Sequence, residues 1–218
     1  MKKNAIALGI ALMGLLSTSA QAVLVTLNPS SLSKAVGDSF TVGLNISGLG
    51  TEIVSAVDLN IYFGAAVLTG VSYTLGSGLG GPWDTTGSQV LAGSFDLQWF
   101  SLTFDPLKTQ QQNDDDLALL QSAGGFTLAT LSFQATGTGA AQISFGLGAN
   151  ERDIVGRDAA FLSGLQFAGA CVAVNDPAGG NIVCPTSVPE PASFGLVGLA
   201  LVGLLVPRRR SGVQSARA

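Results

Sequence analysis

The sequence predicts an all-β protein in which short antiparallel strands pack as a sandwich. Three observations support this fold class. Apolar and polar residues alternate in about eight or nine short segments, Gly, Pro, Asn and Asp separate these segments, and the region between the two termini has no convincing long amphipathic helix. The short connections favour antiparallel pairing.

The clearest strand predictions lie in the first half of the chain. Residues 40–46 and 57–63 alternate between apolar and polar side chains, which is typical of strands with one buried face. Shorter apolar runs at 23–27 and 67–75 predict two further strands.

The apolar phase slips in the second half. Over 90–104 it changes parity at Trp99-Phe100, which predicts either a β-bulge there or a segment covered on both faces. A second slip lies within 126–133. Residues 143–147 predict one clean strand, and 161–174 predict one or two more.

Residues 113–116 (Asn-Asp-Asp-Asp) form the densest group of oxygen donors. We favour a solvated polar loop here. The alternative is a weak calcium site that uses Asp114, Asp115 and Asp116, because calcium takes about six to eight oxygen ligands. The only helix candidate is 115–122, whose Asp residues suit a helix N-terminus.

The N-terminus has the pattern of a secretory signal peptide. Lys2 and Lys3 precede an apolar stretch over 5–16, and the small-residue pattern Ala20-Gln21-Ala22 follows. We therefore assign residues 1–22 to a signal peptide that is cleaved after Ala22.

The C-terminus combines a short motif, an apolar segment and positive charge. The apolar run 194–206 would span only about 20 Å as a helix, short of the roughly 30 Å hydrocarbon core. From the residues alone, it is a weak transmembrane anchor or a removable C-terminal signal, with its basic end on the cytoplasmic side. The motif is Val188, Pro189, Glu190, Pro191, Ala192 and Ser193, and the basic cluster is Arg208, Arg209 and Arg210.

This arrangement over 188–218 resembles the PEP-CTERM sorting signal. The resemblance implies recognition by an exosortase-type processing enzyme and transient residence in the inner membrane. The exported chain would then reach the cell envelope, the cell surface or an extracellular matrix.

Between the two signals lies one domain, which we place at 23–187. From residue 23 to 190 the chain has four bases against all 14 carboxylates, a formal charge of −10. Such a charge disfavours nucleic acid as a partner. The chain has no histidine, which excludes histidine-dependent catalytic triads and the commonest zinc ligand.

Cys171 and Cys184 are the only two cysteines. Export places them in an oxidising compartment, so we predict a structural disulfide. A metal site is less favoured because two thiolates cannot complete a tetrahedral centre, and no Cys-x-x-Cys pair suggests redox chemistry.

Four segments of the domain resemble successive strands of cohesin-like domains: 36–42, 57–63, 125–133 and 139–145. The resemblance implies a single antiparallel jelly-roll β-sandwich of the carbohydrate-binding or cohesin type. Cohesin-like sequences often carry Asp-Pro after the third strand, where this chain has Gly64-Ala65. We therefore expect the fold to be shared, but not dockerin binding.

Trp83 and Tyr62 are weak candidates for a glycan-stacking surface, since aromatic rings offer apolar faces with polar edges. Trp99 is expected in the core, between Leu97 and Phe100. No residue has a recognisable catalytic context. The enzymatic alternative is a carboxylate-dependent glycan hydrolase, which needs one protonated and one ionised acid.

We therefore expect an exported, non-enzymatic protein of the cell surface or matrix, without a required cofactor. It would act in adhesion, or in association with exopolysaccharide or another surface protein, through loops and an edge strand.

Overall fold

The computed structural model describes residues 22–185, except 30, 123, 149, 177, 178 and 180. The chain divides into two units, Met1–Cys184 and Pro185–Ala218. The predicted signal peptide and the predicted sorting tail lie outside the described residues. No helix within the described part is long and apolar enough to cross a membrane.

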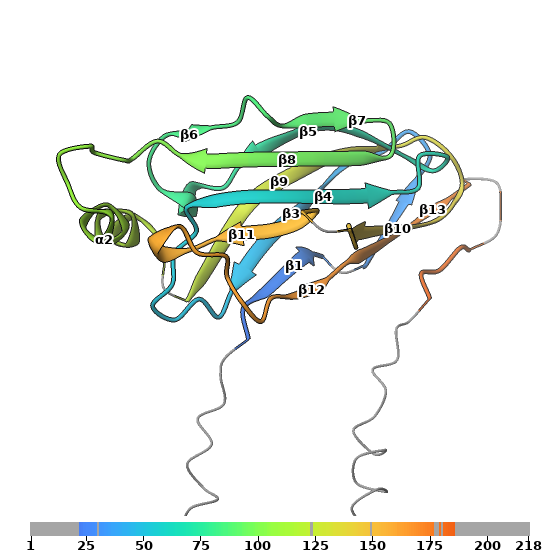
Figure 1. The fold of residues 1–218 in the computed structure, drawn as a ribbon. Helices are drawn as coiled ribbons and strands as arrows, with labels where there is room; N and C mark the ends of the chain where they lie inside the picture. The colour runs from blue at the N-terminus through green and yellow to red at the C-terminus, as the bar shows by residue number, and fades with distance from the viewer. Residues whose placement is uncertain are drawn as a thin grey trace, which may run out of the picture. The chain divides into compact units, whose positions relative to one another are not determined.

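Two β-sheets pack face to face in the first unit (Figure 1), which confirms the predicted all-β sandwich. The first sheet has five strands in the order β12-β1-β3-β9-β5, and the second has eight, with the path β2-β13-β10-β4-β8-β6. In the second sheet β11 also pairs with β4, and β7 with β8. All strand pairs are antiparallel except β1 with β12 and β2 with β13.

The strands are β1 (Leu24–Asn28), β2 (Ser31–Ala35), β3 (Ser39–Ser47), β4 (Ala56–Phe63), β5 (Leu68–Leu75), β6 (Trp83–Asp84), β7 (Gln89–Leu91), β8 (Ser94–Ser101), β9 (Gly125–Ala135), β10 (Gly139–Phe145), β11 (Arg152–Val155), β12 (Gln166–Ala168) and β13 (Ala170–Asn175). The helical segments are η1 (Ser77–Leu79), α2 (Gln110–Leu120) and η2 (Arg157–Ala159).

The core forms where the alternating strands of the two sheets meet. Phe133 of β9 stacks on Phe40 and meets the rings of Phe63 and Phe95 edge to face, at centroid distances of 5.2–5.4 Å. This cluster joins β3 and β9 of the first sheet to β4 and β8 of the second. Trp99 is 2% exposed, as predicted for a core residue.

β8 differs from the sequence prediction. Its pairing with β4 runs without a register shift through Trp99 and Phe100, so the expected bulge is absent from this pair. Phe100, Leu102 and Phe104 are 49–61% exposed, so the segment is not covered on both faces either. These apolar residues occupy every second position, in register with the outward-facing side chains of β8. The second predicted slip corresponds to a register shift between β3 and β9.

The helix is present, but its predicted start is wrong. It begins after Thr109, whose hydroxyl accepts from the N–H of Gln112 while the Gln112 side chain accepts from the N–H of Thr109. This capping box fixes the N-terminus one turn earlier than the Asp residues. Residues 113–116 are therefore helical and do not form the expected loop.

The predicted strand over 143–147 is shorter than expected, whereas the predicted disulfide is confirmed. The clean strand ends at Phe145, and Leu147 lies beyond it, 82% exposed. Cys171 of β13 and Cys184 form the predicted disulfide, with their Cα atoms 5.9 Å apart.

Candidate functional site

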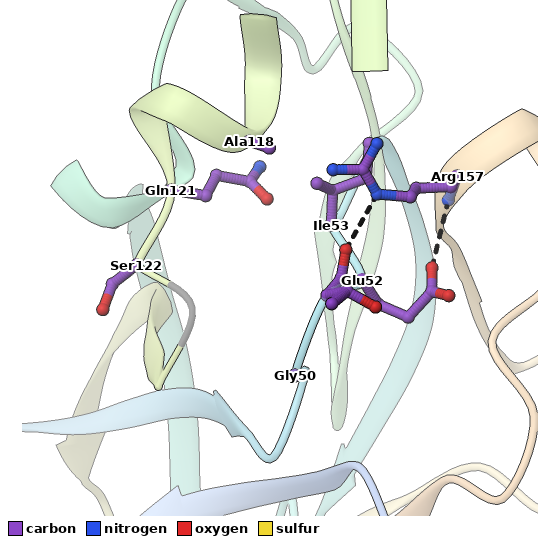
Figure 2. Close-up of a pocket in the computed structure, with 8 residues that line it drawn as sticks. Gly50, Glu52, Ile53, Ala118, Gln121, Ser122 and Arg157 are labelled. Atoms are coloured by element: carbon purple, nitrogen blue, oxygen red, sulfur yellow. Dashed lines mark hydrogen bonds between the residues drawn. The ribbon is translucent and has the colours of Figure 1, made fainter. Parts of the chain in front are cut away.

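A small pocket opens where the loop between β3 and β4 meets the C-terminal end of α2 and the η2 turn (Figure 2). Its volume is about 220 Å³. Pockets for small molecules usually measure about 300–1,000 Å³, so this one is undersized for such a ligand. The residues that line it are Gly50, Thr51, Glu52, Ile53, Ala118, Gln121, Ser122 and Arg157.

Arg157 is the cationic group of this pocket, and its contacts already fix it. Its Nε donates to the Thr51 carbonyl at 2.8 Å, and its Nη1 pairs with the Asp115 carboxylate at 2.8 Å. Its backbone N–H donates to the Glu52 carboxylate at 3.4 Å (Figure 2). The guanidinium therefore ties η2 to the β3–β4 loop and to α2.

Gln121 joins the segments on the other side of the pocket. Its side-chain oxygen accepts from the Val54 N–H at 2.9 Å, and its amide donates to the carbonyls of Val54 and Leu79 at 2.7 and 2.9 Å. The polar groups of Arg157 and Gln121 already form hydrogen bonds within the chain. The pocket is therefore a structural junction between segments, and these two side chains are not free to act on a ligand.

The three residues of the alternative calcium site lie beside this junction, each with its own partner. Asp114 is buried and accepts from the Gln110 amide at 2.8 Å and the Asp158 N–H at 2.7 Å. Asp115 pairs with Arg157, and Asp116 pairs with Lys108. Consecutive helical residues point about 100° apart. Among the described residues no group of three or more acidic or Cys side chains is placed to hold a metal.

The two candidate aromatic residues are not brought together. Trp83 is half-buried, packs against the core and donates from Nε1 to the Gly80 carbonyl at 2.7 Å. It pairs across β8 with Ser101, whereas Tyr62 pairs with Ser94 at the other end of that strand. Tyr62 is 41% exposed, so only Tyr62 offers a large ring surface to solvent.

Tyr62 belongs to an acidic surface on the outer side of the eight-stranded sheet. The register sets Asp58 opposite Asp153 of β11 and sets Asn60 opposite Asp96 of β8. The Tyr62 hydroxyl donates to Glu151 at 2.8 Å. We call this surface the acidic face; its members are Asp58, Asn60, Tyr62, Asp96, Gln98, Glu151 and Asp153.

The electrostatics of the acidic face follow from its crowded oxygens. Burial, together with the carboxylates of Asp96 and Asp153, raises the pKa of Asp58. Hydrogen bonds from the Gly148 N–H and from the Tyr62 hydroxyl lower the pKa of Glu151. One side-chain oxygen of Asn60 and one of Asp96 are buried without a hydrogen-bond partner among the described residues.

No basic side chain neutralises this face, because the four bases of the domain are engaged elsewhere. Lys34 and Arg152 lie over the rings of Phe40 and Phe167, and Lys108 and Arg157 pair with Asp116 and Asp115. The acidic face therefore offers acceptors and negative charge, which favours a positively charged, donor-rich partner.

An apolar row borders the acidic face. Ala56 of β4 lies between Phe100 of β8 and Val155 of β11, and Phe161 forms a bridge with Val155. Phe100 is 50% exposed and Phe161 is 69% exposed. We call these four residues the apolar row.

Sequence reasoning missed most of this surface. The alternation of β4 indicates that Asp58 and Tyr62 share a side, but Asp96 and Asp153 join them only through strand pairing. That pairing is not readable from a single sequence.

Comparisons with known proteins give matches for the C-terminal segment and for the sandwich. Residues 187–210 match the PEP-CTERM protein-sorting motif, which confirms the resemblance of this segment to a PEP-CTERM signal. The motif indicates export across the membrane to the cell surface or the extracellular space, and it implies processing by an exosortase. No curated protein matches the sequence significantly.

The sandwich has the fold of cohesin domains. The seventh ScaB type I cohesin from Pseudobacteroides cellulosolvens superposes with a TM-score of 0.53 at 16% identity, over 72% of this chain and 95% of that one. The cohesin of an OlpA cohesin–dockerin complex from Clostridium thermocellum gives 0.53 at 12% identity, over 71% and 99%. A non-cellulosomal cohesin from Archaeoglobus fulgidus gives 0.51 at 12%, over 71% and 91%. At these identities the similarity shows a shared fold.

Proposed function

We propose that this exported domain is a non-enzymatic adhesion protein that binds a basic protein of the cell surface or matrix through the acidic face and the apolar row. The observation that carries the proposal is the unneutralised charge of the acidic face. Its carboxylates lie side by side on paired strands, while all four bases of the domain are engaged elsewhere.

The chemistry of this surface defines its partner. Lys or Arg side chains would supply the donors and the positive charge that the crowded oxygens of Asp58, Asp96 and Asp153 lack. Exposed rings at Phe100 and Phe161 would anchor apolar side chains, since aromatic residues dominate the energies of most interfaces.

The scaffold supports a protein as the ligand class. Domains of this fold have been crystallised as cohesin–dockerin complexes, so a sandwich of this type can present a surface to another protein. At 12–16% identity only the fold is shared, and the dockerin itself is not carried over to this chain.

Affinity capture from the extracellular fraction of the producing cells tests the proposal. The wild-type chain is expected to retain a basic protein that high salt releases, because exposed charges are screened within about 10 Å at 0.1 M salt. The double variant Asp58→Asn/Asp96→Asn should retain at least about tenfold less.

The double variant Asp38→Asn/Asp105→Asn is the matched control, because it removes the same two charges from outside the face. Asp38 lies in the turn between β2 and β3, and Asp105 lies between β8 and α2. Capture that survives the double variant Asp58→Asn/Asp96→Asn contradicts the proposal. Release of reducing sugar from a glycan, abolished by Asp58→Asn, would instead establish the hydrolase alternative.

Delivery is tested separately. Replacing Pro189, Glu190 and Pro191 by Ala should leave the unprocessed chain in the inner membrane, which intact-mass measurement would detect. Normal processing of that variant would contradict the sorting assignment.

A further inference from the structure

The first sheet differs from the second in having no charge at all. None of the five strands β1, β3, β5, β9 and β12 contains an Asp, Glu, Lys or Arg. This is unexpected in a chain whose residues 23–190 have a formal charge of −10. The second sheet carries Asp58, Asp84, Asp96 and Asp153 in its strands.

The outward positions of the first sheet carry hydroxyls and amides in rows. One row is Thr26, Asn45 and Thr127, across β1, β3 and β9. Beyond Gly43 and Thr130, another row is Thr41, Ser132 and Ser72, across β3, β9 and β5. We call this surface the neutral face.

Most of the hydrogen-bonding capacity of the neutral face is unused within the chain. The Thr127 hydroxyl donates to the Asn45 side-chain oxygen at 2.7 Å. No side-chain hydrogen bond among the described residues engages the hydroxyls of Thr41, Ser132 or Ser72.

A hydroxyl is both a donor and an acceptor, and an amide side chain carries one of each. A surface of these groups is therefore complementary to a copy of itself, as a two-fold symmetric interface requires. The acidic face is not self-complementary, because its carboxylates only accept hydrogen bonds and repel one another. Two copies that each carry a formal charge of −10 over residues 23–190 approach each other with the least repulsion through the neutral face.

We propose that two copies of this chain associate through their neutral faces as a two-fold symmetric dimer. The five strands differ in length, from three residues in β12 to 11 in β9. At about 3.3 Å per residue and about 4.8 Å between strands, together they cover about 570 Å². That area is near the lower limit of standard interfaces, about 600 Å² from each partner. In this arrangement the acidic faces point away from each other and both stay accessible.

The edge strand β5 of the first sheet is less suited than the neutral face to pairing with a second copy. The pairing of β5 with β9 shifts register between Gly70 and Ser72, and the extra residue Val71 is 56% exposed. A bulge interrupts the straight row of backbone groups that edge-to-edge pairing requires. Association through the face is therefore favoured over a continuous sheet between two copies.

Sedimentation of the chain, expressed with both terminal segments and purified in its exported form, tests this proposal. The wild type is expected to have about twice the monomer mass at about 100 μM, since interfaces of this size reach micromolar or tighter affinity. Ser132→Asp should sediment as a monomer because it buries an unpaired charge. Ser144→Asp is the matched control on β10 of the other sheet, opposite Tyr62, and should stay dimeric.

Thr41→Lys places the opposite charge on the neutral face and should also give a monomer, so the test does not depend on one variant folding. Thermal melts identify any variant that fails to fold. A monomeric wild type at about 100 μM, or a dimer that survives both face variants, overturns the proposal. The proposal is also overturned if the wild type is a monomer that binds dextran, a neutral polysaccharide, and if Ser132→Asp abolishes that binding. None of these results depends on capture of a basic partner.

Discussion

The two outer faces of this sandwich rest on one core but differ in chemistry. The acidic face has adjacent carboxylates and two buried oxygens without a partner in the described part of the chain. The apolar row, with its exposed rings of Phe100 and Phe161, borders it. The neutral face consists of hydroxyls and amides on strands without charge. A shared scaffold can therefore carry a surface for a different protein on one side and a surface for its own copy on the other.

The largest expected effect is on the core that supports both faces. Phe133→Ala removes the ring that contacts Phe40, Phe63 and Phe95 across the two sheets, and should lower the free energy of unfolding by about 3–5 kcal/mol. Denaturant unfolding measures this. Phe161→Ala, the same change at an exposed site of the apolar row, should stay within about 0.5 kcal/mol of wild type but reduce capture of the basic partner. Equal losses of stability would contradict the assigned core.

Loss of the disulfide should affect one sheet more than the other. Replacing both Cys171 and Cys184 by Ser opens a cross-link with a sequence separation of 13, which in the chain-entropy model stabilises the fold by about 3 kcal/mol. The denaturation midpoint should fall, while dimerisation under native conditions should persist because β13 lies outside the first sheet. A dimer lost with the disulfide in a folded variant would show that the neutral face is not independent.

A smaller effect should reveal the charge crowding on the acidic face. Because the folded-state pKa of Asp58 lies above its ordinary value of 3.8, its ionised form costs stability at neutral pH. That cost disappears as the pH falls through the raised pKa. Asp58→Asn should therefore stabilise the domain at pH 7 by about 0.2–1 kcal/mol, the size of a cross-strand pair effect.

The gain from Asp58→Asn should shrink as the pH approaches 3.8, because wild-type Asp58 is then becoming protonated as well. Melting curves of the wild type and of Asp58→Asn across this pH range measure the gain. Asn60→Asp, which adds a carboxylate to the same strand, should destabilise the domain at pH 7. A stabilising Asn60→Asp would show that the face is not crowded with negative charge.

The smallest expected effect concerns calcium. Each of Asp114, Asp115 and Asp116 already has a partner within the chain, so a chelator should leave the melting midpoint unchanged. A rise in midpoint with added calcium, lost in Asp114→Asn, would support the calcium site that was the alternative interpretation of the sequence.

The sequence alone could predict the layers of this fold but not its surfaces. Alternation over 40–46 and 57–63 is a local signal and gave correct strands. The exposed parity of Phe100 was misjudged because apolar composition indicates burial only on average. The helix start was detectable, since Thr109 and Gln112 have capping-box spacing, but the acidic run 114–116 suggested a later start.

The candidate site was harder to predict because it depends on contacts between distant segments. Asp58, Asp96 and Asp153 become neighbours only when β4 pairs with β8 and β11. The neutral face needs no pairing to be noticed, since its strands lack charge in the sequence itself. Its location on one sheet is known only from the strand order.

Site-specific photo-crosslinking in the producing cells tests the division of labour between the two faces most directly. A photoreactive residue in place of Phe100 on the apolar row should give an adduct with a basic protein of the surface or matrix. The same residue in place of Thr41 on the neutral face should give an adduct of twice the chain mass. The same adduct from both positions, or a self-adduct from position 100 with none from position 41, would contradict the account.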